Sequence, residues 1–170
     1  MTEVYTWDDV ARGDYFIDYQ NLYTHLGVLS IRELFVSCSD IFLAAGERER
    51  ALEMIDKCVD VMQHYPLETV PLGFSNNDYM VVLMIDRYYE LGQADKARAL
   101  AVQMGSELLK SAQFYLEFFE FGKDEFDLIR QFIYALADVM KAGGDADLST
   151  QLTDNLVTLV DKALEVLNAS

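Results

Sequence analysis

One phrase recurs along this chain of 170 residues. Residues 39–51 read SDIFLAAGERERA, residues 85–97 read IDRYYELGQADKA, and residues 137–149 hold a weaker copy, ADVMKAGGDADLS. Each copy has an Asp, an aromatic residue or Met two positions later, then a Gly followed by small or apolar residues. Self-similarity at a spacing of tens of residues is typical of stacked helical hairpins. The phrase therefore predicts an all-α, repetitive architecture, which favours binding over chemistry.

The composition agrees with a helical domain and narrows its partners. The chain is 52% apolar and 12% aromatic and has only two prolines, which is typical of a folded, helix-rich protein. Its net charge is −16 and its few Lys and Arg residues are scattered, so binding to nucleic acid or to anionic lipid is not expected. The longest apolar run, MVVLMI at 80–85, is far shorter than the roughly 20 residues that span a bilayer, so we expect no direct membrane insertion.

Two regions are expected. Residues 1–27 are aromatic and lack a period, and they are predicted to form an irregular N-terminal strap. Residues 28–170 repeat apolar side chains at helical spacing, and they are predicted to form one helical domain of three stacked antiparallel hairpins. The turns are expected at Gly46, Gly92 and Gly144, inside hairpins that span about 28–64, 76–121 and 124–168.

The hairpin pattern resembles the tetratricopeptide repeat, which has an aromatic residue before the turn, Gly at the turn and small residues after it. Small residues let the paired helices approach closely, and Gly permits the chain to reverse. The spacing is longer than in that repeat, and the third copy is degenerate. The matching positions are Phe42, Gly46, Ala51, Ile55 and Cys58, then Tyr88, Gly92, Ala97, Ala101 and Met104, then Met140, Gly144, Ser149, Thr153 and Leu156.

Three carboxylates share one position of the phrase, six residues before each Gly: Asp40, Asp86 and Asp138. In a tetratricopeptide-like stack this position faces the concave groove, where a row of carboxylates suits a peptide that carries Lys or Arg. The alternative is that each Asp pairs locally, for example Asp86 with Arg87, or is solvated. The same registration predicts four further groove residues, which are Glu33, Tyr79, Tyr89 and Tyr134.

Chemistry-bearing motifs are missing from the sequence. It holds no phosphate-binding loop, dinucleotide fingerprint, zinc-protease motif, nucleophile elbow or CxxC pair. His25 and His64 fall in different predicted units, and neither has ligand partners at metal-binding spacing. We therefore predict that this chain is not an enzyme and holds neither a cofactor nor a metal ion. Cys38 and Cys58 lie on apolar helix faces and are expected to be buried free thiols, although a disulfide stays open in an oxidising compartment.

An aromatic run occupies residues 114–121. Core packing explains such a run more readily than a docking surface does. The run is too dense for one helix face, however, so part of it is expected at the surface.

Longer stretches of the chain resemble one family. Residues 18–58, 73–101 and 113–118 look like the C-terminal soluble part of large bacterial membrane proteins whose multi-spanning region is similar to protein O-mannosyltransferases, long catalogued as a domain of unknown function. The resemblance implies an excised C-terminal domain that is membrane-associated through its parent, with the periplasmic side favoured over the cytoplasmic side. It also implies that the presumed catalytic carboxylates lie in the membrane part, outside this chain.

Together these observations predict a non-catalytic interaction or scaffold module. Its partner is expected to be a peptide, a protein, or the membrane region of its own parent chain. Two alternatives stay open: a domain that binds the acceptor or glycan and takes direct part in glycosyl transfer, and a purely structural domain that self-associates.

Overall fold

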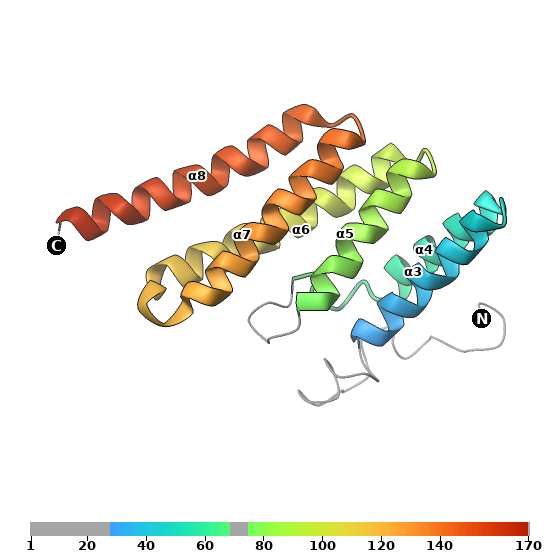
Figure 1. Ribbon diagram of the computed structural model, residues 1–170, viewed down its shortest axis with the longest axis horizontal. Helices are drawn as coiled ribbons and strands as arrows, with labels where there is room; N and C mark the ends of the chain where they lie inside the picture. Colours follow the sequence, from blue (N-terminus) through green and yellow to red (C-terminus); the bar gives the residue numbers. More distant parts are fainter. Residues whose placement is uncertain (1–27, 69–74, 170) are drawn as a thin grey trace. The chain divides into compact units, whose positions relative to one another are not determined.

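The computed structural model of this chain describes residues 28–68 and 75–169 (Figure 1). Within these ranges it has six helices and no strand. The all-α class predicted from the sequence is therefore confirmed for the described part of the chain. The aromatic strap predicted at 1–27 lies outside the described residues. None of the described helices combines the length and the apolar character that crossing a membrane requires.

The chain divides into two compact units, which meet in sequence at Leu67 and Glu68. The first unit contains α3 (Val28–Ala44) and α4 (Arg48–Val61), which pack against each other. The guanidinium of Arg32 is also buried in this unit, and its Nη2 donates a hydrogen bond to the backbone oxygen of Pro66 at 3.0 Å. Fully buried apolar side chains of these two helices are Phe35, Ile55, Cys58 and Val61.

The second unit contains four helices in two layers. They are α5 (Ser75–Glu90), α6 (Ala94–Glu117), α7 (Phe119–Ala142) and α8 (Ala146–Ala169). Each helix packs on the next, α5 also contacts α7, and α6 also contacts α8 (Figure 1). One layer therefore holds α5 and α7, and the other holds α6 and α8. Fully buried side chains between the layers include Val81, Ile85, Met104, Leu108, Ile129, Ile133 and Leu136.

The recurring phrase encodes one turn, used three times. Gly46, Gly92 and Gly144 have φ of 78°, 78° and 98°, in the left-handed region that glycine adopts without a steric penalty. In each turn the residue after the Gly donates its backbone N–H to the carbonyl five residues back, at 2.8 Å, 2.8 Å and 2.9 Å. This is the Schellman arrangement that ends a helix. The accepting carbonyls belong to Phe42, Tyr88 and Met140, the aromatic or Met position of the phrase.

The junction between α6 and α7 differs from the boundary that the sequence predicts. The pattern predicts a helix end at Gly122 and a new helix near Asp124. The structure does interrupt the helix at Gly122, which is a non-helical kink with φ −117° and ψ 23°, but α6 already ends at Glu117 and α7 begins at Phe119. A Cβ added at Gly122 would lie 2.3 Å from Cδ1 of Tyr115, so the ring of Tyr115 occupies the space of a side chain there.

Candidate functional site

The three carboxylates of the phrase lie in different surroundings. Asp40 is half-buried on α3, in the first compact unit, and Glu33 is exposed on the same helix. Asp86 on α5 accepts a hydrogen bond from Nη1 of Arg87 at 2.9 Å, which is the local pairing considered as an alternative to the ladder. Asp138 is exposed on α7. Asp86 and Asp138 therefore belong to one described unit, and Asp40 belongs to the other.

Two of the three predicted tyrosine anchors face solvent. Tyr79 on α5 and Tyr134 on α7 are 50% and 47% exposed. Tyr79 precedes Asp86 by two helical turns, and Tyr134 precedes Asp138 by about one turn, so each ring shares a helix face with a carboxylate. The two helices contact each other, and each carries an exposed tyrosine on the same face as a carboxylate.

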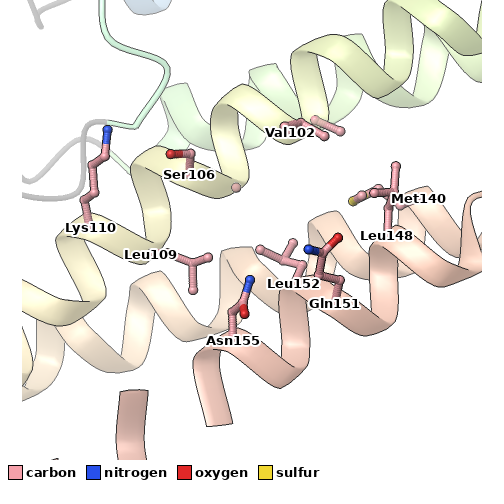
Figure 2. A pocket seen from close by; sticks show the side chains of 11 residues that line it. Val102, Ser106, Leu109, Lys110, Met140, Leu148, Gln151, Leu152 and Asn155 are labelled. Carbon is pink, nitrogen blue, oxygen red and sulfur yellow. The ribbon is translucent and has the colours of Figure 1, made fainter. Parts of the chain in front are cut away.

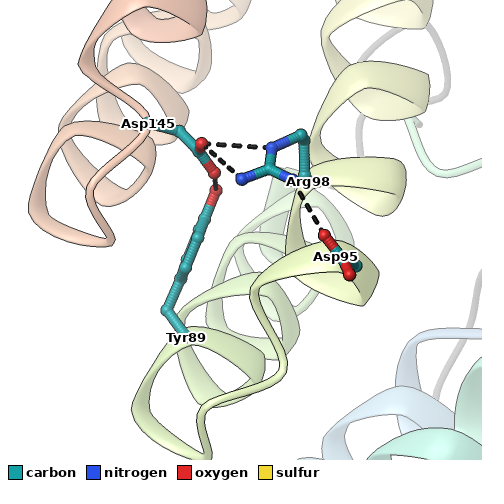
Figure 3. A network of polar contacts seen from close by, with 4 residues as sticks. All are labelled: Tyr89, Asp95, Arg98 and Asp145. Carbon is teal, nitrogen blue, oxygen red and sulfur yellow. Dashed lines mark hydrogen bonds and ion pairs between the residues drawn. The ribbon is translucent and has the colours of Figure 1, made fainter.

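The third tyrosine is part of a polar network (Figure 3). The hydroxyl of Tyr89 donates to Oδ2 of Asp145 at 2.6 Å. Arg98 donates from Nε and Nη2 to Oδ1 of the same carboxylate at 3.1 Å and 2.8 Å, and from Nη1 to Asp95 at 2.9 Å. The network joins the end of α5 and the first turns of α6 to the turn between α7 and α8. Tyr89 is thus held by a structural contact, a role that the groove registration did not predict.

The network shifts the pKa values of its members. The hydrogen bonds from Arg98, which have the larger effect, and from Tyr89 hold the pKa of the Asp145 carboxyl below its ordinary value. Burial acts in the opposite direction. Burial, followed by the hydrogen bond to Asp145, raises the pKa of the Tyr89 hydroxyl. The hydrogen bond to Asp145 raises the pKa of Arg98. All three shifts favour the ionised carboxylate with a neutral tyrosine and a charged guanidinium, so the network holds one charge state and has no group ready to exchange protons.

The aromatic run at the junction of α6 and α7 is mostly at the surface, so core packing is wrong for most of it. Phe121 is 85% exposed, and three further phenylalanines of the run are also exposed. Two of them, Phe114 and Phe118, contact each other with ring centroids 5.1 Å apart. Phe119 also contacts the buried ring of Phe126, with centroids 5.9 Å apart. Tyr115, half-buried against Gly122, is the member of the run that packs inward.

A cleft lies between α6 and α8 in the second unit (Figure 2). Its volume is about 350 Å³. The sequence patterns did not predict this cleft. Its floor includes two small residues of α6, Ala101 and Gly105, and small residues at helical spacing predict only close helix packing. The other lining residues are Val102, Ser106, Leu109, Lys110, Met140, Leu148, Gln151, Leu152 and Asn155.

Groups suited to metal binding or nucleophilic chemistry do not gather in the described residues. No cluster of three or more His, Cys, Asp or Glu side chains able to hold a metal ion occurs within 28–68 and 75–169. His64 is exposed, and His25 lies outside the described residues. Cys38 and Cys58 are free thiols, and burial raises the pKa of Cys58 to about 12, so that thiol stays protonated at neutral pH.

Comparisons with known proteins find no relative of this chain. No protein-family model matches this chain, and neither the curated proteins nor the solved structures include a similar one. The function is therefore argued from the geometry of the surfaces described above.

Proposed function

We propose that this chain is a non-catalytic, tetratricopeptide-like interaction module that binds a cationic peptide segment on the surface formed by α5 and α7. Its binding surface, termed here the Tyr/Asp face, consists of Tyr79, Asp86, Tyr134 and Asp138. The observation that carries the proposal is the pair of half-exposed tyrosines, each on the same helix face as a carboxylate. Tyrosine supplies apolar contact area with a polar tip, a combination that is common at protein interfaces.

Electrostatics favour a cationic partner. The chain carries a net charge of −16, and long-range attraction speeds the encounter with a positively charged segment. Arg87 bonds both Asp86 and Glu90, at 2.9 Å and 3.2 Å, so one guanidinium faces two carboxylates and leaves local negative charge. A Lys or Arg from a partner could share these oxygens without burying an unpaired charge.

The tetratricopeptide-like arrangement is part of the proposal. Three identical Schellman turns and a buried small residue five positions after each turn glycine support it. Those residues are Ala51, Ala97 and Ser149, at 0%, 0% and 7% exposure. In such an arrangement the first helices of successive pairs line one surface, which is where α5 and α7 carry the Tyr/Asp face.

The resemblance to large bacterial membrane proteins suggests where in the cell the module acts. We propose that it is the soluble C-terminal domain of a membrane glycosyltransferase-like parent, membrane-associated through that parent, on the periplasmic side. Its cationic partner would then be a loop of the parent's own membrane region or a secreted acceptor protein. An immunoblot of fractionated native cells with an antibody to this domain tests the placement: a membrane band far above 19.4 kDa supports it, and a soluble band near 19.4 kDa refutes it.

Peptide selection tests the binding function directly. The purified chain is screened against displayed random peptides, and the enriched peptides are measured by fluorescence anisotropy. We expect enrichment of Lys or Arg together with apolar residues. The double variant Asp86→Asn/Asp138→Asn should weaken binding by about tenfold or more, as loss of charge-assisted contacts does. The matched control Asp154→Asn/Asp161→Asn removes two exposed carboxylates from α8 and should leave affinity within about twofold.

A glycan is the alternative ligand, because exposed tyrosines beside carboxylates also suit sugar binding. Thermal shift against neutral mannose oligosaccharides separates the two ligands. Stabilisation by sugars that is lost in Tyr79→Ala/Tyr134→Ala, without any enriched cationic peptide, would replace the peptide hypothesis with glycan binding. Equal weakening by the Tyr/Asp-face and α8 double variants would instead mean that only net charge matters, and the site assignment would be wrong.

A further inference from the structure

We propose that the cleft between α6 and α8 binds an amphipathic monocarboxylate, a molecule with an aliphatic chain and a single carboxylate head. This site is separate from the Tyr/Asp face, and the inference does not depend on the proposed peptide binding. It rests on three features of the lining residues: their shape, their lack of negative charge, and polar side chains that bond to no other residue in the described part of the chain.

Small residues produce the hollow. Ala101 and Gly105 lie one turn apart on α6 and leave its surface flat where a larger side chain would fill the space. Leu152 of α8 closes the floor, since its Cδ1 would lie only 3.0 Å from a Cβ placed on Gly105. The resulting volume of about 350 Å³ falls in the range of roughly 300–1,000 Å³ that small-molecule pockets occupy.

The walls are apolar. Leu109 on α6 and Leu152 on α8 face each other across the cleft, with Leu148 and Met140 further along it (Figure 2). Val102, also lining the cleft, is 52% exposed although it is aliphatic. An aliphatic chain placed here would remove Val102 and the half-buried Leu109 from water, which is favourable by about 25 cal/mol per Å² of apolar surface buried.

The rim lacks the negative charge that dominates the rest of the molecule. The chain has 29 Asp and Glu residues, yet none of them lines the cleft. By contrast, another surface hollow, on α4, is lined by Glu53, Asp56, Lys57 and Asp60. The single charged lining residue of the cleft is Lys110. A ligand carboxylate therefore meets one positively charged lining side chain here and no acidic one.

The polar rim has unused hydrogen-bonding capacity. Ser106 and Lys110 lie one turn apart on α6, and Gln151 and Asn155 lie one turn apart on α8. None of these four side chains has a hydrogen bond or ion pair with any other residue in the described part of the chain. Figure 2 shows Gln151 and Asn155 reaching from α8 toward α6, while the side chain of Lys110 points away from α8. The flexible four-carbon stem of Lys110 allows its ammonium to fold over the cleft mouth, where the two amides would also donate to a carboxylate.

The test uses three ligands with the same ten-carbon chain and different heads: decanoate, decanol and decyltrimethylammonium, all below micelle formation. Binding is followed by NMR of the full chain with ¹³C-labelled methionine methyl groups, because Met140 lines the cleft and Met140→Leu assigns its signal. We expect decanoate to shift the Met140 signal saturably and to bind more tightly than decanol, and the cation to bind most weakly.

Variants connect the binding to the cleft. Lys110→Glu should weaken decanoate by about tenfold or more, since it reverses the head-group attraction, and should change decanol little. Ser106→Phe places a ring at the cleft mouth and should weaken both ligands. The control Lys123→Glu makes the same charge change at an exposed position of α7, outside the cleft lining, and should leave decanoate affinity within about twofold. Far-UV circular dichroism verifies that each variant keeps its helices.

Each contrary result overturns the proposal. An unchanged Met140 signal excludes occupation of the cleft. Equal binding of decanoate and the cation removes the electrostatic argument. Decanoate affinity that Ser106→Phe leaves unchanged would place the ligand elsewhere, for instance on the exposed phenylalanines. The peptide assay is unaffected by these outcomes, because its residues lie on α5 and α7.

Discussion

At the scale of single residues, the carboxylate of Asp145 accepts hydrogen bonds from two side chains of the second unit. Three hydrogen bonds reach its two oxygens, from Tyr89 and from two nitrogens of Arg98. Its side chain is only 13% exposed, whereas the neighbouring Asp147 is exposed. A half-buried carboxylate that accepts several hydrogen bonds favours its ionised form, so this residue links folding to pH.

We predict that the stabilising effect of Asp145 disappears in acid. The pKa of Asp145 is lowered in the folded chain, so its contribution is fully present above the ordinary carboxyl pKa of about 3.9 and is lost as the pH falls through the lowered folded value. The difference in free energy of unfolding between the wild type and Asp145→Asn should therefore be large at pH 7 and should shrink below about pH 4. Urea titrations at several pH values measure it.

Asp147→Asn is the matched control, two residues away and exposed. It should cost little at any pH, because the side chain of Asp147 is exposed. The difference in free energy of unfolding between wild type and Asp145→Asn could instead stay constant from pH 7 down to pH 3. That result would show that the packing of Asp145, and not its charge, is stabilising.

The sequence could not assign this role to Tyr89. Its place in the phrase predicts a groove residue, whereas its partner Asp145 lies 56 positions away. Asp145 itself follows Gly144, and this position predicts only a turn residue. Tyr79 and Tyr134 lie on solvent-facing surfaces as a groove would require, because helical spacing alone decides which way they face. Helical spacing predicts which face of a helix a residue lies on, but it does not predict a contact between residues that are far apart in the sequence.

At the scale of elements, the turn between α7 and α8 is fixed by a glycine that precedes the left-handed one. Gly143 has φ −74° and ψ −4°, which any residue adopts. A Cβ there, however, would lie 2.3 Å from Cδ1 and 2.4 Å from Cγ of Tyr89. The aromatic ring thus packs directly on the backbone of the turn, and Asp145 holds the ring in place through its hydroxyl.

We predict that Gly143→Ala destabilises the chain by about 1–3 kcal/mol, the usual cost of forcing an extra carbon into a packed site. Chemical unfolding measures the change. In a Tyr89→Ala background the ring is absent, so the same Gly143→Ala change should cost almost nothing or stabilise the turn by reducing the freedom of the unfolded chain. An equal cost in both backgrounds would mean that the collision with Tyr89 is not the cause.

Element positions were largely predictable, since the signals for them are local. The three turn glycines lie where left-handed φ is needed, and the helices begin and end within a few residues of the predicted turns. The junction of α6 and α7 was not predictable, because Gly122 reads as a helix end although it serves as a kink against Tyr115. The cleft was also missed, because it forms only where Gly105 meets Leu152 of a helix some 47 residues away.

At the scale of the whole molecule, net charge opposes folding. The chain has 29 acidic and 13 basic residues, and its net charge is −16 at pH 7. Compaction brings these like charges together, which destabilises the folded state. Several of the ion pairs join partly exposed side chains three residues apart on one helix. Such pairs contribute only about 0–1 kcal/mol each, so repulsion among the excess carboxylates should outweigh them.

We therefore predict that moderate salt stabilises this chain. Raising NaCl from about 0.01 M to about 0.15 M shortens the screening length from about 30 Å to about 8 Å, which weakens long-range repulsion more than contacts at hydrogen-bond distance. Each 1 kcal/mol of relieved repulsion should raise the Tm by about 2–4 °C for a chain of this size. Differential scanning calorimetry at pH 7 in NaCl and in tetramethylammonium chloride measures the change. Equal rises in both salts indicate screening, whereas a rise in NaCl alone would indicate sodium binding. A Tm that falls with salt would show that short-range pairs, with Arg98 and Asp145 foremost, outweigh the net charge.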